Sequence, residues 1–293
     1  MHWQKITLVG IGLLGGSLGL AIKQRRLAGT VEGFVRRSAS VAECENLGVV
    51  DKARLDLASA VAGADLIVIC TPIAQMRALA EEMLPALQRG ALITDVGSVK
   101  GSVVQELEPR FASVGAHFIG SHPMAGAEKM GVSAARADLF LEAICALTPT
   151  PNSKPEQLSK LEEFWKSVGA RTLKLPPDLH DDLVSRSSHL PHVVAAELAN
   201  YVLSPIHPKE QAMLCATGFR DTTRIASGSP EMWRDISLAN RKNLARVLGV
   251  FIEDLQEFQI ALEHEDRKVI QDFFEKAKER RDQWSQAVSP SPE

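Results

Sequence analysis

Short apolar runs alternate with amphipathic segments through the first 175 residues. Residues 5–9, 31–35, 65–70 and 91–96 are rich in aliphatic side chains and are bounded by Gly, Pro or charged residues. Between them, apolar residues recur every three or four positions, which is typical of helices. Further apolar runs occur at residues 118–120, 144–148 and 172–175. Strands that alternate with helices through short links predict an α/β fold with one doubly wound parallel sheet.

The pattern changes after Pro176-Pro177, and no convincing strand follows. Four segments with helical spacing occupy residues 179–203, 209–226, 230–263 and 266–287. Residues 244–262 carry an apolar face over several turns, and such a face needs a partner to cover it. We therefore predict an α/β domain over residues 1–176, an all-α domain over 177–288 and a disordered tail over 289–293.

Composition narrows the class of protein. The chain has 293 residues, 45% hydrophobic and 24% charged, which is ordinary for a soluble globular protein. A net charge of −3 provides no electrostatic basis for binding nucleic acid or an anionic membrane. The four cysteines form no CxxC pair, so neither a disulfide framework nor a thiolate metal site is predicted. With no apolar run of membrane-spanning length and no secretory leader, we expect a cytoplasmic protein.

The first apolar run leads directly into Gly10-Ile11-Gly12-Leu13-Leu14-Gly15, and a helix is predicted to follow. This GxGxxG pattern between a strand and a helix is the fingerprint of a Rossmann-type dinucleotide site. Gly10 would make the turn, Gly12 would let the pyrophosphate approach the backbone, and Gly15 would let helix and strand pack closely. Leu13, Leu14 and Cys70-Thr71-Pro72, which ends another strand, complete the predicted cofactor site.

The end of the second strand bears on which cofactor binds. NAD enzymes usually carry an acid there to hold the ribose hydroxyls, but this chain reads Val35-Arg36-Arg37-Ser38. Two arginines and a serine suit a 2′-phosphate, so the sequence favours NADP over NAD. The alternative is that Arg36 and Arg37 are solvated loop residues.

Four segments carry candidate chemistry. His122 lies in a Gly/Pro frame over residues 120–126, which predicts a turn that holds an imidazole near the cofactor. Ser98 follows a strand and would either orient a substrate group or cap the next helix. His189 and His192 are spaced to share one face of a helix. Arg224 belongs to a segment that also contains Gly218 and Arg220. An arginine is a strong anchor for a carboxylate.

A zinc site built from His180, Asp181, His189 and His192 is an alternative that lacks thiolates or an HExxH frame. We therefore predict no metal.

In combination, these segments resemble the prephenate/arogenate dehydrogenase family of tyrosine biosynthesis. The matching residues, which follow the family's order, are 9–17, 70–72, 94–100, 120–126 with Glu128, 147–150, 188–192, 218–226 and 232–235.

The resemblance implies oxidative decarboxylation of prephenate or arogenate, with hydride transfer from ring C4 to NAD(P)+. It implies that His122 accepts the proton of the 4-hydroxyl and that Ser98 hydrogen-bonds beside it. Arg224 would hold a substrate carboxylate, and His189 would contact the side chain. The resemblance also places His180 in the pocket wall, Glu128 at the mouth and Trp233 in the lining.

The resemblance further implies a homodimer made by the helical domain. From the length we expect no fused chorismate mutase or regulatory domain, so any tyrosine feedback would act at the active site. Two alternatives remain. A β-hydroxyacid dehydrogenase would need a catalytic lysine, for which Lys242 is a poorly framed candidate. A non-catalytic NAD(P)-sensing protein would not need Ser98, His122, His189 and Arg224 together.

Overall fold

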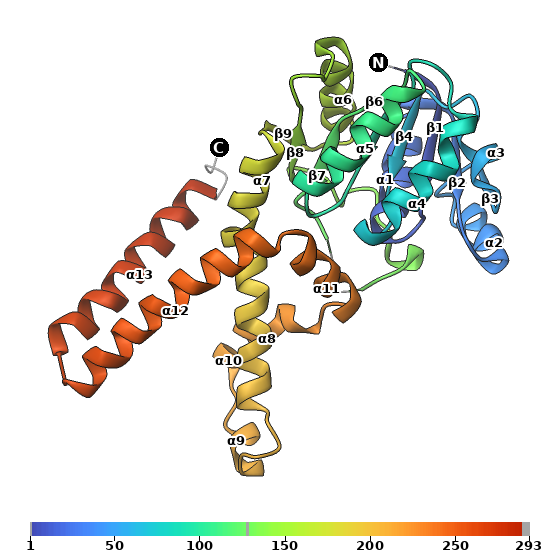
Figure 1. The fold of residues 1–293 in the computed structure, drawn as a ribbon. Helices are drawn as coiled ribbons and strands as arrows, with labels where there is room; N and C mark the ends of the chain where they lie inside the picture. Colours follow the sequence, from blue (N-terminus) through green and yellow to red (C-terminus); the bar gives the residue numbers. More distant parts are fainter. Residues whose placement is uncertain (1, 127–128, 289–293) are drawn as a thin grey trace. The chain divides into compact units, whose positions relative to one another are not determined.

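The computed structural model describes residues 2–126 and 129–288. Its contacts divide the chain into two compact units, Met1–Arg241 and Lys242–Glu293. The first holds both sheets and helices α1 to α11, and the second holds α13 and nearly all of α12 (Figure 1). Glu128 and the predicted disordered tail lie outside the described residues. The predicted boundary at residue 176 falls inside the first unit and stays a prediction.

A six-stranded parallel sheet forms the centre of the first unit. Its strand order is β3-β2-β1-β4-β5-β6, which reverses direction between β1 and β4. This order confirms the predicted Rossmann-type doubly wound sheet. The strands are β1 (Trp3–Val9), β2 (Ala28–Phe34), β3 (Lys52–Arg54), β4 (Leu66–Ile69), β5 (Leu92–Asp95) and β6 (His117–Phe118).

Helices cover both faces of this sheet, which explains why its central strands are uninterrupted apolar runs. In β4, Leu66 and Val68 belong to the core cluster that includes side chains of α1, α2 and α6. Ile67 and Ile69 point the other way, into the cluster with α3, α4 and α5. The helices are α1 (Leu13–Gln24), α2 (Ser38–Asn46), α3 (Leu57–Val61), α4 (Ile73–Met83), α5 (Gly101–Ser113) and α6 (Pro155–Ser167).

The three later strands form a second, small sheet. β7 (Gly120–Pro123) pairs antiparallel with β8 (Ile144–Thr148), which pairs parallel with β9 (Arg171–Lys174). The expectation that the runs at residues 144–148 and 172–175 continue the main sheet is wrong. β6 is only two residues long, and the chain leaves the main sheet after it. Apolar runs identify strands, but they do not identify the strands with which they pair.

Beyond residue 176 the described part of the chain consists of helices and short links and contains no strand. In the first unit it forms α7 (Pro177–Val184), a π-helical turn (Ser185–His189), α8 (Leu190–Val202), α9 (Lys209–Met213), α10 (Thr217–Thr223), a 3₁₀ turn (Arg224–Ser227) and α11 (Pro230–Ala239). The second unit contains α12 (Arg241–Glu263) and α13 (Arg267–Val288), which are joined by contacts of Phe258 with Phe273 and Phe274. Among the described helices, none combines the length and hydrophobicity needed to cross a membrane.

Candidate active site

The glycine loop has the steric features expected of a dinucleotide site. Gly10 has φ +97°, and a Cβ on it would lie 2.7 Å from a Thr71 side-chain carbon. A Cβ on Gly15 would lie 2.1 Å from the carbonyl oxygen of Gly10, so no other residue fits there. A Cβ on Gly12 would meet nothing within 4 Å, which leaves this side of the loop open. The loop therefore combines two packed glycines with one that faces free space.

This loop lies where the strand order of the main sheet reverses. Gly10 follows β1 and Thr71 follows β4, and ligands of open α/β sheets bind at such a switch point. Gly12 is the N-cap of α1 and provides no side-chain cap, so the helix terminus is available to an anion. The Thr71 hydroxyl is buried and has no hydrogen-bond partner within the described residues. A pyrophosphate fits this set of groups.

The loop after β2 carries free positive charge. Arg36 and Arg37 are exposed, and neither makes an ion pair with any described residue. The nearby acid Glu32 is already engaged, with its carboxylate 3.2 Å from Lys5 Nζ and 3.0 Å from Arg54 Nη2. Ser38 begins α2, and Val35, at the position where an acid was expected, is buried.

His122 lies inside strand β7, opposite Ala146, rather than in the predicted turn. Backbone pairing with β8 therefore holds the imidazole. The side chain is 7% exposed. Burial, reinforced by electrostatic repulsion from the nearby basic groups of His180, Lys100 and His189, holds the pKa of His122 well below its usual range. The imidazole is therefore neutral at neutral pH and is able to accept a proton.

A hydrogen-bonded chain leads away from His122. Its Nδ1 lies 2.9 Å from Nε2 of His180, and Nδ1 of His180 lies 2.8 Å from Oδ1 of Asp181. All three residues are buried. His180 thus contacts His122 directly, whereas the family resemblance implied only a position in the pocket wall.

The Asp181 carboxylate is anchored at the start of helix α5. The backbone amide of Lys100 donates to Oδ1 at 2.7 Å, and that of Gly101 donates to Oδ2 at 2.8 Å. These amides begin the helix that follows Ser98, so Ser98 is not its cap. Within the described residues the half-buried Ser98 side chain makes no hydrogen bond, and it is available to a ligand.

A second buried group joins β5 to β7. Lys100 Nζ forms an ion pair with Asp95 and donates to the carbonyl of Ser121 at 2.8 Å. Asp95 Oδ1 also accepts the amide of Ser121 at 3.2 Å. Ser121 precedes His122, so this ion pair fixes the backbone that carries the imidazole.

The π-helical turn between α7 and α8 sets the position of His189. His189 lies nine positions after His180, and in a regular α-helix this is about two and a half turns, which would place the two side chains on opposite faces. Pro191 lacks the amide that would bond the carbonyl four residues earlier, which favours a widened turn just before it. The side chain of Asn240 connects α7 to this turn. Its Nδ2 donates to the backbone carbonyl of Asp181 at 2.8 Å and lies 3.2 Å from Nδ1 of His189.

Nε2 of His189 makes no hydrogen bond within the described residues. Because the Asn240 amide donates to Nδ1, neutral His189 carries its proton on Nε2. That Nε2 is buried without a hydrogen-bond partner in the described part of the chain, although the Ser98 carbonyl is close enough to affect its charge. Burial lowers the pKa of His189 to about 4. The nitrogen is therefore a neutral donor available to a ligand.

Aromatic contacts extend this cluster to α11. Trp233 stacks on His192 with ring centres 3.7 Å apart, and it meets His189 edge-on at 6.1 Å. His192 Nδ1 donates to the Ser188 carbonyl at 2.9 Å. Arg224 begins the 3₁₀ turn that packs against α8, and its exposed side chain lies outside the buried cluster.

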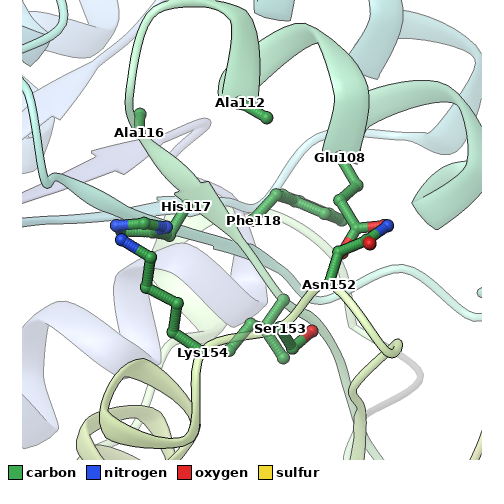
Figure 2. Close-up of a pocket in the computed structure, with 9 residues that line it drawn as sticks. Glu108, Ala112, Ala116, His117, Phe118, Asn152, Ser153 and Lys154 are labelled. Atoms are coloured by element: carbon green, nitrogen blue, oxygen red, sulfur yellow. The ribbon is translucent and has the colours of Figure 1, made fainter.

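A small cavity elsewhere in the first unit is unrelated to this cluster. It has a volume of about 50 Å³ and lies between α5, β6 and residues 152–154, lined by residues that include Glu108, His117 and Lys154 (Figure 2). A ring substrate needs several hundred Å³. None of the predicted site residues that the structure describes lines the cavity.

The sequence did not identify Asp181, Asn240, Asp95 or Lys100 as supports of the site. Asp181 entered only the zinc alternative, and its carboxylate is instead occupied by backbone amides and His180. Asn240 has no local motif, and it lies 51 residues from His189. For Asp95 and Lys100, the sequence did offer one signal of a supporting role. Both are charged residues at the end of an otherwise apolar strand, where burial is expected.

A dinucleotide loop at the switch point and a buried neutral histidine define an NAD(P)-dependent dehydrogenase. Residues 18–174 match the family described as "Prephenate dehydrogenase, nucleotide-binding domain". Residues 176–279 match "Prephenate dehydrogenase, dimerization domain". The chain belongs to the prephenate dehydrogenase family.

Individual relatives agree with this assignment. The chain is 36% identical to a prephenate dehydrogenase of Bacillus subtilis over 94% of this chain and 75% of that protein. It is 32% identical to a cyclohexadienyl dehydrogenase of Zymomonas mobilis, over 95% of each. A solved prephenate dehydrogenase of A. aeolicus, in complex with hydroxyphenyl propionate and NAD+, superposes with a TM-score of 0.90 at 29% identity, covering 97% of this chain and 99% of that chain. Lys242, considered for a β-hydroxyacid dehydrogenase, is exposed here.

Proposed function

We propose that the protein oxidises and decarboxylates prephenate, arogenate or both, giving 4-hydroxyphenylpyruvate or tyrosine. The observation that carries this proposal is the buried, neutral His122, connected through His180 to the Asp181 carboxylate in a chain with a dinucleotide loop. Bound NAD(P)+ supplies the acceptor for the hydride that leaves ring C4. The relatives named prephenate and cyclohexadienyl dehydrogenases support the same ring chemistry.

In this proposal His122 Nε2 accepts the proton of the 4-hydroxyl as the hydride leaves. The C–C bond to the ring carboxylate then breaks, its electron pair enters the ring, and carbon dioxide departs. The ring becomes aromatic, and the phenolate oxygen takes back one proton to give the 4-hydroxyl of the product. His122 therefore stores one proton and returns it, with no net proton released. Ser98, whose hydroxyl makes no hydrogen bond to another described residue, would orient the substrate oxygen.

The rest of the substrate is assigned to the helical side. Arg224 would bind a carboxylate, and an arginine suits this role because its planar fork matches the carboxylate oxygens. The buried Nε2–H of His189 would donate to an oxygen of the side chain. Trp233, stacked on His192, would line the pocket. Glu128, assigned to the mouth, lies outside the described residues. Tyrosine, as a product analogue, would inhibit at these same groups.

For the cofactor, we propose a preference for NADP over NAD. Arg36 and Arg37 are exposed and lack ion-pair partners among the described residues, and Ser38 starts α2 beside them. A 2′-phosphate would gain charge-assisted hydrogen bonds there. Gly10, Gly12, Leu13, Leu14, Gly15 and Cys70-Thr71-Pro72 would hold the rest of the dinucleotide.

The test of the function crosses prephenate and arogenate with NAD+ and NADP+, following absorbance of the reduced cofactor. We expect turnover with at least one substrate and a higher kcat/KM with NADP+. Absence of turnover in all four combinations would contradict the proposed function. A higher kcat/KM with NAD+ would contradict only the cofactor preference.

The cofactor preference has its own variant test. Arg36→Ala removes the positive charge assigned to the 2′-phosphate, so its KM for NADP+ should rise about tenfold or more, with little change for NAD+. Arg171→Ala, an exposed arginine of β9, is the matched control and should leave both values unchanged. Equal effects of Arg36→Ala on the two cofactors would reject the assignment.

A further inference from the structure

The proton chemistry assigned to His122 depends on which of its nitrogens carries a hydrogen. A neutral imidazole has one N–H and one lone pair, and only the lone pair can accept the substrate proton. One ring nitrogen, Nδ1, faces His180, which leaves Nε2 for the substrate. The site works only if Nδ1 is protonated and Nε2 is not.

The hydrogen-bonded chain decides this when it is followed from Asp181. The carboxylate accepts from two backbone amides, and an amide can only donate. Asp181 Oδ1 therefore also accepts from His180, which must carry its hydrogen on Nδ1. Neutral His180 then has its lone pair on Nε2, and it can only accept from His122 Nδ1. The result is a lone pair on His122 Nε2.

We propose that His180 and Asp181 are positioning residues that hold His122 in its Nδ1–H tautomer and take up the positive charge when His122 is protonated. This inference rests on the proposed function, in which His122 stores one proton. When Nε2 accepts the substrate proton, the hydrogen on His122 Nδ1 shifts to His180 Nε2. His180 becomes the imidazolium, next to Asp181, and His122 is neutral again. The reverse shift returns the proton to the product, so atoms and charge balance.

The charged groups around His122 favour this displacement. His122 itself faces His180 of α7, His189 of the π-helical turn and Lys100 before α5, and Cys145 of β8 lies beside it. None of these is an anion that could stabilise an imidazolium there, and Asp95 is paired with Lys100. Asp181 contacts His180 instead. A positive charge is therefore more stable one residue away from the ring that collects it.

Asp181 is well held for this role. Its carboxylate lies at the N-terminus of the 13-residue helix α5, where the helix dipole and two amides favour the anion. Asn240 holds the backbone carbonyl of the same residue. A carboxylate bound on this many sides cannot rotate away when the charge on His180 changes.

The first test needs neither substrate nor cofactor. Long-range proton–nitrogen NMR spectra of the ¹⁵N-histidine-labelled protein distinguish the two neutral tautomers, and His122→Asn and His180→Gln assign the signals. We expect Nδ1–H for both His122 and His180. His192, which donates from Nδ1 to a carbonyl, and His189, which accepts there, are internal references of opposite type. An Nε2–H tautomer at His122 overturns the proposal.

The second test separates orientation from charge uptake. In His180→Gln, the amide oxygen can accept from His122 Nδ1 but cannot become charged, so the tautomer should persist while kcat falls by about 10–10²-fold. In Asp181→Asn both functions are weakened, and kcat should fall by about 10²–10⁴-fold with a smaller change in KM. The acid limb of the kcat/KM profile should move to lower pH, since less anionic charge stabilises the protonated pair.

Asp56→Asn is the matched control, because Asp56 also caps a helix through its carboxylate, at α3 and outside the site. It should leave kcat unchanged. If both His180→Gln and Asp181→Asn retain kcat within about twofold, the proposal fails. If neither substrate is turned over by the unmodified protein, the proposed function fails, while the tautomers measured by NMR still decide the orientation of the chain.

Discussion

His122 shows how little a residue type says without its neighbours. A histidine between glycine and proline is more often structural than catalytic. The observation that supports a catalytic role is its hydrogen bond to His180, 58 positions away in the chain. His180 in turn contacts the Asp181 carboxylate. The buried environment then keeps the imidazole neutral, with its pKa well below the usual range.

Replacing this imidazole tests its role at the residue scale. His122→Asn keeps a polar side chain but removes the base, so kcat should fall by about 10²–10⁴-fold while cofactor binding persists. Steady-state kinetics and cofactor titration by fluorescence measure the two effects. His117→Asn, in β6 and lining the separate cavity of Figure 2, is the control and should retain activity. An unchanged kcat in His122→Asn would remove His122 from the mechanism.

Among elements, the glycine loop was the most predictable from sequence. Steric constraints on glycine are local: the positive φ of Gly10 and the closeness of Gly15 to the Gly10 carbonyl follow from one turn between β1 and α1. The π-helical turn was not predictable in the same way. Pro191 signals a disturbed helix, but the face on which His189 then lies depends on the Asn240 contact.

Two alanine substitutions in this loop should behave differently. Gly15→Ala places a methyl group 2.1 Å from a backbone oxygen, so the free energy of unfolding should fall by about 1–3 kcal/mol or more. Gly12→Ala meets open space and should fold normally, yet weaken cofactor binding about tenfold or more, because the methyl occupies the space assigned to the pyrophosphate. Thermal unfolding with and without cofactor measures both, and equal stability of the two variants would contradict the packing argument.

For the whole molecule, the helical region leaves apolar side chains uncovered in the single chain. Tyr201, Ile206, Met213 and Leu214 follow one another along the end of α8 and through α9, and the last three are 83–84% exposed. Soluble proteins rarely leave such a cluster in water unless another chain covers it. The match of residues 176–279 to a dimerization domain supports a homodimer.

This dimer can be tested directly. The unmodified protein should sediment as a dimer, and Met213→Glu with Leu214→Glu should shift it toward the monomer, because two buried charges would oppose association. Leu55→Glu, an exposed leucine after β3, is the control and should remain dimeric. A monomeric unmodified protein, or an unchanged dimer in the double variant, would contradict this interface.

The sequence by itself determined the architecture: a doubly wound sheet, a dinucleotide loop between its first strand and helix, and a helical second half. These follow from periodicity and glycine sterics, which act over a few residues. Only the tertiary structure decided that β7 to β9 form a separate sheet, that Asp181 rather than Ser98 serves the N-terminus of α5, and that His180 contacts His122. Each of these joins residues about 25 to 80 positions apart, and local patterns cannot select such partners because packing and hydrogen bonding across elements determine them.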